Sequence, residues 1–213
     1  RKCLNFLCMH RNKFLSIEGN IGAGKTSLAR MIADEFNFQL ILEEFAENTF
    51  LQQFYESPEK FAFPLEMSFM AARYKQLKTF FNKNTLPFPI VSDYMFQKTL
   101  LFAKSNLKNN EYGLFEQFFQ MLNVGLPLPQ LIVYLQKEIP SLQKNIKKRG
   151  RDYEQNMKDD YLLKINNAYG RFMKRAQKSS NILIINTEGL DFVRKRSDFQ
   201  KILETIEKAG FRF

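Results

Sequence analysis

Gly19-Asn20-Ile21-Gly22-Ala23-Gly24-Lys25-Thr26 is the stretch that decides the fold, because it fits the pattern G-x-x-x-x-G-K-[ST] of a phosphate-binding loop. Residues 14–18 before it have the composition of a strand. The residues after it predict a helix over 27–36, with Leu28, Ile32 and Phe36 on one face. A strand, a loop and a helix in this order are the context that the motif requires, which disfavours a chance glycine-rich turn.

The residue types of this loop suit a nucleoside triphosphate. Glycines let the backbone approach phosphate oxygens, and the N–H groups of the loop and of the helix N-terminus carry positive partial charge. In such loops the lysine reaches the β- and γ-phosphates and the hydroxyl ligates Mg²⁺, which predicts these roles for Lys25 and Thr26. The predicted nucleotide-binding residues of the loop are Gly19, Asn20, Ile21, Gly22, Ala23, Gly24, Lys25, Thr26 and Ser27.

The composition fits one α/β domain, since the 213 residues are 45% hydrophobic and 25% charged. We expect residues 1–12 to be an N-terminal extension and residues 13–213 to form the domain. Residues 1–9, with Leu4, Phe6 and Leu7, are too short and too poorly flanked for a convincing signal peptide, and Met9 could be the native start. No apolar run approaches the roughly 20 residues of a membrane span, so we expect no membrane partner.

Cysteine and histidine are scarce. The two cysteines, Cys3 and Cys8, offer neither a disulfide framework nor a zinc spacing, which favours a reducing, cytoplasmic setting. The single histidine, His10, precedes the first strand, so serine–histidine chemistry is disfavoured. A general base is therefore expected to be a carboxylate.

The formal net charge is +10, which suits either a nucleic-acid surface or a polyphosphate pocket. The basic residues are spread along the chain and are densest over residues 144–151. No RNA-binding motif with interleaved aromatic residues is present in the sequence. We therefore favour polyphosphate binding over nucleic acid.

Hydrophobic patterns predict five strands, over residues 14–18, 40–43, 90–93, 131–135 and 181–186. Helices are predicted over 27–36, over 58–82 with a bend or break near Pro64, and from the end of the third strand to about 107. Further helices are predicted over 111–124, 140–148, 159–178 and 199–209. This alternation indicates an α/β fold with a five-stranded parallel sheet covered on both faces, of the P-loop NTPase type. Ligands of such sheets bind beyond the carboxyl ends of the strands, where Glu43 and Asp93 are expected.

Two further segments carry charges that could serve a site. Glu66 and Arg73 lie about 10 Å apart on one face of a predicted helix, and Phe69 and Met70 lie between them. They could hold a flat heterocycle, although the pattern alone favours ordinary surface charges. The segment Arg149-Gly150-Arg151 ends a basic helix. It could be a mobile lid that closes on the transferring phosphate, or it could be a solvated helix end, and we favour the lid.

In this order, these features resemble the deoxynucleoside kinase family, which includes the deoxycytidine, deoxyguanosine and deoxyadenosine kinases. The resemblance covers about residues 13–192. Glu43-Glu44-Phe45-Ala46 resembles the segment that carries the base for the 5′-hydroxyl, which favours Glu43 and leaves its neighbour Glu44 as an alternative. The resemblance implies sugar contacts from Tyr55 and Glu154, a base-reading Glu66 and a base-framing Arg73.

On the donor side, Arg149 and Arg151 resemble the arginines of the family's lid, here about residues 149–157. Asp191-Phe192 resembles the loop that packs on the donor adenine. The resemblance implies that ATP with Mg²⁺ is the phosphoryl donor, that a deoxynucleoside is the acceptor, and that the long helices form a homodimer.

Two positions depart from the family pattern. Asp93-Tyr94-Met95 stands where the family commonly has Asp/Glu-Arg-Ser. Asp93 keeps the acid, which could bind Mg²⁺ or be the catalytic carboxylate. Tyr94 replaces the arginine, and Asp93 and Tyr94 are both expected to contact the substrate near its 5′-hydroxyl. Glu66 replaces a common glutamine. An ionised carboxylate only accepts hydrogen bonds, which suits the N1–H and N2–H₂ donors of guanine and hence favours a purine. A protonated carboxyl group would imitate glutamine and remove this preference.

Two other activities stay open at this point. A nucleoside monophosphate kinase, such as a thymidylate kinase, would need extra cations for the acceptor's own phosphate. An NTP-dependent nucleic-acid-binding protein would account for the charge of +10. A GTPase is disfavoured, because the sequence has no Asn-Lys-x-Asp motif.

Overall fold

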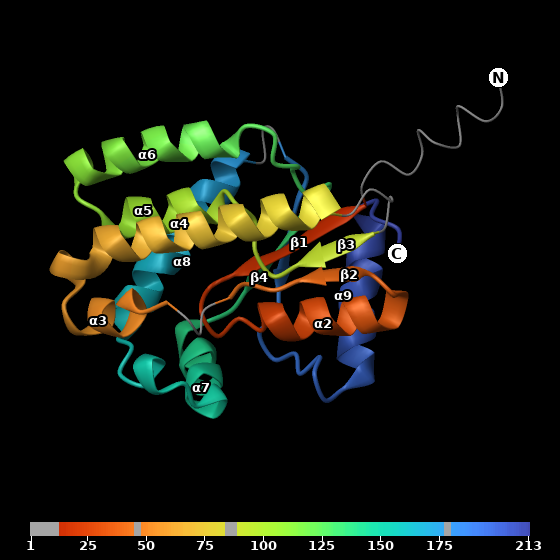
Figure 1. Ribbon diagram of the computed structural model, residues 1–213. Helices are drawn as coiled ribbons and strands as arrows, with labels where there is room; N and C mark the ends of the chain where they lie inside the picture. Colours follow the sequence, from red (N-terminus) through yellow and green to blue (C-terminus); the bar gives the residue numbers. More distant parts are fainter. Residues whose placement is uncertain (1–12, 45–47, 84–88, 177–179) are drawn as a thin grey trace, which may run out of the picture.

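The protein is described by a computed structural model over residues 13–44, 48–83, 89–176 and 180–213. The expected N-terminal extension, Phe45 and Ala46 lie outside these residues. Five parallel strands form one sheet in the order β2 (Gln39–Ile41), β3 (Ile90–Ser92), β1 (Phe14–Gly19), β4 (Leu131–Gln136) and β5 (Ile182–Asn186), shown in Figure 1. The prediction of a five-stranded parallel sheet is confirmed.

Helices cover both faces of the sheet (Figure 1). One face packs on α2 (Lys25–Phe36) and α9 (Arg196–Lys208). The other packs on α4 (Pro58–Lys83), α5 (Lys98–Asn106) and α8 (Asp159–Ala176), with α6 (Asn109–Asn123) stacked against α4 and α5. The central strand β1 is buried along its whole length, because Leu15 and Ile17 face the first layer while Phe14 faces the second.

Three short elements lie near the carboxyl ends of the strands. Helix α7 (Ile139–Arg149) runs into Gly150, which adopts a left-handed conformation, and a 3-10 turn, η1 (Asp152–Glu154), follows. Helix α3 (Phe50–Glu56) packs on α4 and was not predicted, because seven residues are too short for a clear helical period. Among the helices of the described residues, none has the length and hydropathy needed to cross a bilayer.

Two boundaries differ from the prediction. Helix α4 is not interrupted at Pro64 and continues as one element, although a proline there removes one helical hydrogen bond and crowds the carbonyl four residues earlier. Strand β2 ends at Ile41 rather than at Glu43. Glu43 therefore lies beyond the strand, at the edge of the sheet where ligands bind.

The phosphate loop leaves β1 between its neighbours β3 and β4, at the position where the chain switches sides of the sheet. Gly22 has φ 82°, and a Cβ there would lie 2.7 Å from the Leu142 carbonyl oxygen. Gly24 has φ 94°, and a Cβ there would lie 2.8 Å from Cζ of Phe192. Both positions therefore exclude a side chain, which explains why the loop needs glycine at them.

Candidate active site

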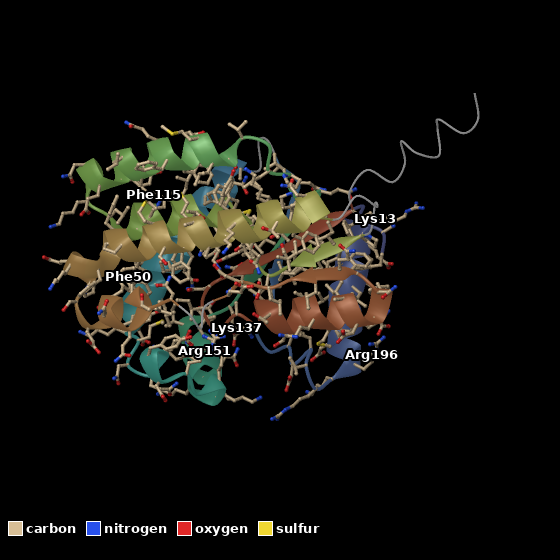
Figure 2. The ribbon with its side chains drawn as sticks, in the orientation of Figure 1. Lys13, Phe50, Phe115, Lys137, Arg151 and Arg196 are labelled. Atoms are coloured by element: carbon tan, nitrogen blue, oxygen red, sulfur yellow. The ribbon has the colours of Figure 1, made fainter. Side chains whose placement is uncertain are left out.

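A cleft lined by basic residues opens beside the phosphate loop; we call it the basic cleft. Residues 22–27 form one wall and residues 188–194 form another. Its side chains carry many positive charges, which come from Lys25, Lys137, Lys144, Lys148, Arg149, Arg151 and Arg194. Figure 2 labels two of these residues, Lys137 and Arg151, at the edge of the sheet near α7. This concentration suits a polyphosphate anion.

Most residues predicted to bind the nucleotide line the basic cleft: Gly22, Ala23, Gly24, Lys25, Thr26, Ser27, Arg149, Arg151, Asp191 and Phe192. The first three residues of the motif do not line it. Gly19 ends the buried strand β1. The Asn20 side chain is turned to α8, where Nδ2 donates to the Leu162 carbonyl (2.8 Å) and to Asn166 Oδ1 (2.6 Å). Ile21 faces a different cleft, described below.

Phe192 contributes a buried ring that packs over Gly24 rather than an open surface. Its neighbour Asp191 lies at the cleft wall, where its backbone N–H donates to Asp198 Oδ2 at 3.0 Å. The loop that holds both residues is therefore fixed at its far end by α9. Of the two, Asp191 is the more accessible to a ligand in the basic cleft.

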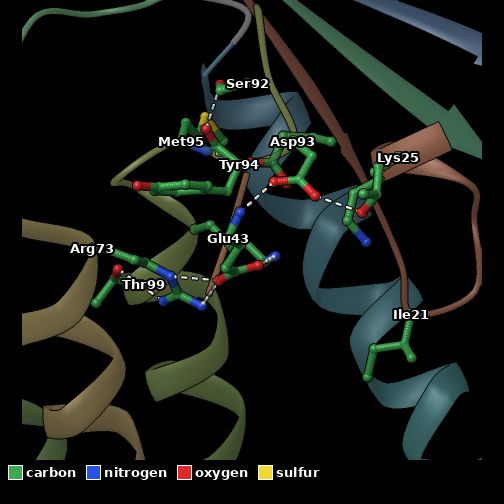
Figure 3. Close-up of polar contacts among 12 residues, drawn as sticks. Ile21, Lys25, Glu43, Arg73, Ser92, Asp93, Tyr94, Met95 and Thr99 are labelled. Atoms are coloured by element: carbon green, nitrogen blue, oxygen red, sulfur yellow. Dashed lines mark hydrogen bonds and ion pairs between the residues drawn. The ribbon is translucent and has the colours of Figure 1, made fainter. Parts of the chain in front are cut away.

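Thr26 lines this cleft and contacts the buried Asp93, which does not line it. The Thr26 hydroxyl donates to Asp93 Oδ2 at 2.5 Å, and the Glu43 backbone N–H donates to Asp93 Oδ1 at 2.7 Å. Figure 3 shows Asp93 between Glu43 and the start of the helix that carries Lys25. A hydroxyl and a carboxylate oxygen are ligands that Mg²⁺ accepts, and Mg²⁺ is usually held by few protein oxygens together with substrate phosphates. The pair therefore fits that ion, although the described residues contain no cluster of three metal-ligating side chains.

Lys25 is half-buried against the loop, and its Nζ donates to the Asn20 carbonyl at 2.9 Å. Burial, reinforced by the charge of Lys98, lowers the pKa of Lys25 to about 8, while the carboxylates nearby oppose this shift. A triphosphate in the cleft would favour the charged form of the lysine.

Glu43 is buried between two cations, of which Figure 3 labels Arg73. Its Oε1 accepts from Arg73 Nε at 2.7 Å and lies 2.5 Å from Arg73 Nη2, and its Oε2 accepts from Lys98 Nζ at 2.6 Å. Burial alone would raise the pKa of Glu43, but the charges of Arg73 and Lys98 together lower it to about 2. The side chain is therefore a carboxylate at neutral pH. Glu43 lines neither the basic cleft nor the second cleft described below, whereas Arg73 and Lys98 both line the second cleft.

Lys98 supplies the cation that sequence analysis missed. Tyr94 occupies the position of the family's arginine, but it is fully buried and its hydroxyl donates to Gln76 Oε1 at 2.5 Å. The structure thus places Tyr94 in the core and puts Lys98, five residues after Asp93 and at the start of α5, against Glu43. The only feature of the sequence that could have indicated this role is that Lys98 follows the altered motif Asp93-Tyr94-Met95 by about one helical turn.

A second cleft, which we call the aromatic cleft, is lined by residues from α3, α4, α5, η1 and α8. Its walls are Ile21, Lys25, Leu51, Phe54, Tyr55, Leu65, Glu66, Phe69, Arg73, Lys98, Phe102, Arg149, Arg151, Glu154 and Tyr161. The predicted acceptor residues Tyr55, Glu66, Phe69, Arg73 and Glu154 therefore come together here. Met70 does not, because it packs in the core between α4 and the sheet.

The expectation that Glu66 and Arg73 are ordinary surface charges is wrong, since they are 1% and 4% exposed. Arg73 is held by Glu43 and lies 5.0 Å from the centre of the Phe69 ring, and its Nη1 donates to Thr99 Oγ1 at 3.0 Å. Period and composition could not reveal this burial, because it depends on the partner that α5 supplies.

Glu66 has one satisfied and one unsatisfied oxygen. Its Oε1 accepts from Asn106 Nδ2 at 2.7 Å, whereas Oε2 is buried and has no hydrogen-bond partner among the described residues. Burial raises the pKa of Glu66 to about 7, although the Asn106 hydrogen bond and the Arg73 charge oppose the shift. Asn106 and Tyr161, which complete this corner, were not predicted.

Three cations, those of Lys25, Arg149 and Arg151, line both clefts. Arg149 and Arg151 are ion-paired with Glu154, and the Arg151 Nη1 to Glu154 Oε1 distance is 3.5 Å. A group that passes from one cleft to the other would therefore move between a lysine and two guanidiniums. This geometry suits the transfer of an anionic group, such as a phosphoryl group, between two bound molecules.

Comparison with known proteins supports the same chemistry. The family model described as "Deoxynucleoside kinase" matches residues 15–209, and the chain therefore belongs to the deoxynucleoside kinase family. It is accordingly a kinase that transfers a phosphoryl group from a nucleotide to a deoxynucleoside. Family membership confirms the resemblance and selects this activity from those that the sequence left open.

Relatives and solved structures cover nearly the whole chain. Deoxyguanosine kinase of Bacillus subtilis is 33% identical over 207 residues, which are 94% of this chain and 99% of that protein. Deoxyadenosine kinase of Dictyostelium discoideum is 30% identical over 200 residues, 92% of this chain and 80% of that protein. The structure of deoxyadenosine kinase from M. mycoides with bound dATP has a TM-score of 0.78 at 24% identity, over 92% of this chain and 99% of that one.

Proposed function

We propose that the enzyme transfers the γ-phosphoryl group of ATP to the 5′-hydroxyl of a purine deoxynucleoside, with Mg²⁺. The observation that carries this proposal is the junction of the two clefts at Lys25, Arg149 and Arg151. ATP would occupy the basic cleft, and the deoxynucleoside would occupy the aromatic cleft. Residues 13–213 would act as one catalytic unit, with the lid at about residues 149–157.

The donor side has the groups that phosphoryl transfer needs. The loop amides and Lys25 would hold the β- and γ-phosphates, and Thr26 with Asp93 would hold Mg²⁺, which neutralises developing charge. Arg149 and Arg151 would exchange part of their ion pairing with Glu154 for contacts with the transferring phosphoryl group. Charge stabilisation by such preorganised cations is the main source of acceleration in this reaction.

Glu43 is the residue that we assign to the 5′-hydroxyl. A carboxylate with a pKa of about 2 is a weak base, but in a loose transition state its main task is to orient the hydroxyl. Lys98 and Arg73 would fix its position and keep it ionised. Asp93 is the alternative carboxylate, and its contacts with Thr26 and with the Glu43 backbone favour a role at the ion instead.

The acceptor side accounts for a nucleoside. Tyr55 and Glu154 would bind the sugar, while Phe69 and Arg73 would frame the base and Glu66 would read its edge. A purine is supported by the carboxylate at position 66 and by relatives named deoxyguanosine and deoxyadenosine kinases. Among the described residues, the cations of the aromatic cleft are Lys25, Arg73, Lys98, Arg149 and Arg151. Arg73 and Lys98 are paired with Glu43, and the other three also line the basic cleft. None of these cations is therefore left over for a phosphate on the acceptor, which favours a nucleoside over its monophosphate.

A homodimer is the assembly that we propose. Four apolar side chains on the outer side of α6 or at its end are exposed, namely Leu114, Phe118, Met121 and Val124, with 39–80% of their surface accessible. Their spacing places Leu114, Phe118 and Met121 on one helix face, and such a stripe is typical of a protein–protein contact.

A panel of acceptors tests the proposal. Deoxyguanosine, deoxyadenosine, their ribonucleosides and their 5′-monophosphates would be incubated with enzyme and Mg-ATP, and the products separated by chromatography. We expect 5′-monophosphates from the purine deoxynucleosides. Preferential conversion of the monophosphates to diphosphates would contradict the proposal and favour a monophosphate kinase.

A further inference from the structure

We propose that Glu66 selects between purines by the proton on its Oε2, accepting a hydrogen bond from the N1–H of a 6-oxopurine and donating one to the N1 of a 6-aminopurine. The acceptor preference of the enzyme would therefore change with pH. This inference rests on the proposed function, because it assigns the base edge to the aromatic cleft.

The geometry separates the roles of the two Glu66 oxygens. The Asn106 amide donates to Oε1 at 2.7 Å, so a proton on that oxygen would face another donor. Any proton on the carboxyl group is therefore expected on Oε2. That atom is buried and has no hydrogen-bond partner among the described residues, while Glu66 itself lines the cleft. A buried polar atom without a partner is costly, and a ligand edge would satisfy it.

The chemistry of the bases is complementary at this atom. Guanine and hypoxanthine carry a hydrogen on N1, which requires an acceptor, whereas adenine has a bare N1, which requires a donor. A carboxylate only accepts and a carboxylic acid can donate, so each protonation state matches one class of base. Sites that must pair a buried donor or acceptor reject a mismatched ligand strongly, because the group is left unsatisfied.

Both protonation states are accessible near neutral pH. Burial raises the pKa of Glu66 to about 7, with Glu43 acting in the same direction and with Asn106, Arg73 and Lys98 opposing it. The hydroxyls of Tyr55 from α3 and Tyr161 from α8 have pKa values raised by burial and stay neutral. The remaining charged groups of the cleft are Lys25, Arg149, Arg151 and Glu154.

The decisive experiment measures kcat/KM for deoxyguanosine and for deoxyadenosine with Mg-ATP, from about pH 6 to about pH 8.5. All steps shared by the two acceptors, including any titration of Lys25, cancel in the ratio. Since each base would use one protonation state, the ratio should rise about tenfold per pH unit in favour of deoxyguanosine. Deoxyinosine, which has the N1–H but lacks the 2-amino group, should follow deoxyguanosine.

Variants assign the effect to this side chain. Glu66→Gln should give a ratio that does not change with pH and that favours deoxyadenosine, because the Asn106 amide would hold the oxygen of the glutamine and leave its NH₂ group as a donor toward N1 of the base. Glu59→Gln, at an exposed glutamate of the same helix, should keep the slope of the wild type. If Glu66→Gln does not fold, the wild-type series still decides.

The outcomes separate the two claims. A ratio that is constant with pH while both nucleosides are phosphorylated would overturn the inference and leave the proposed function intact. A slope that persists in Glu66→Gln would also overturn the inference. Failure to phosphorylate any deoxynucleoside would overturn the proposed function and the inference with it.

Discussion

One buried carboxylate, Glu43, organises the candidate site because two cations meet on it. Arg73 comes from α4 and Lys98 from α5, so the ion cluster joins the two helices across the aromatic cleft. We propose that Lys98 takes the place of the arginine that Tyr94 replaces, since its Nζ contacts Glu43. The cation beside the carboxylate would then come from another position instead of being lost.

This view of Lys98 leads to a first prediction. Lys98→Met should lower kcat by about 10²-fold, a typical cost of removing one preorganised group, with a smaller change in KM for the nucleoside. Lys98→Arg should recover much of kcat, because it restores the charge beside Glu43. Lys104→Met, at an exposed lysine of the same helix, is the matched control. Equal kcat values in Lys98→Met and Lys104→Met, at equal thermal stability, would rule out the role.

The free energy of unfolding should depend on pH through the protonation of Glu66. Its pKa is about 7 in the fold and about 4.5 in the unfolded chain, so the stabilisation from the protonated form is complete below pH 4.5 and is lost as the pH rises through 7. Compared with Glu66→Gln, the wild type should lose about 3 kcal/mol between these limits. Urea unfolding of both proteins at about pH 4.5 and about pH 8 measures this difference. A difference that does not change with pH would mean that Glu66 has an ordinary pKa.

At the scale of elements, the fold could be predicted because its signals are local. The phosphate loop and the alternation of strands with helices depend on neighbouring residues, and the five strands were found within about two residues of their ends. Helix α3 was missed because it has seven residues. Lys98, Asn106 and Tyr161 were missed because they reach the site only through the packing of α5 and α8, which one sequence does not encode locally.

The lid at the end of α7 carries the next prediction. Arg151→Gln should lower kcat by about 10²–10³-fold, because it removes a cation that lines both clefts, while the affinity for the deoxynucleoside changes little. Lys147→Gln, at an exposed position of the preceding helix α7 that does not line the basic cleft, is the control. Single-turnover kinetics separate the two effects. A loss of affinity with unchanged kcat would assign Arg151 to acceptor binding alone.

For the whole molecule, the exposed side of α6 makes the assembly testable. Met121→Glu, at a methionine with 70% of its surface exposed, should convert the proposed dimer to a monomer without loss of helix content. Light scattering after size exclusion gives the mass, and circular dichroism gives the fold. Gln200→Glu, on the exposed side of α9, adds the same charge elsewhere and should leave the mass unchanged. A monomeric wild type would contradict the proposed assembly.

The central claim is that the basic cleft delivers a phosphoryl group to a hydroxyl held in the aromatic cleft, across Lys25, Arg149 and Arg151. The most direct measurement follows ATP labelled on its γ-phosphate, with deoxyguanosine or with 2′,5′-dideoxyguanosine as acceptor. We expect the label in the 5′-monophosphate of deoxyguanosine and no transfer to the analogue that lacks the 5′-hydroxyl. Equal labelling of both acceptors, or label on the 3′-oxygen, would contradict the account.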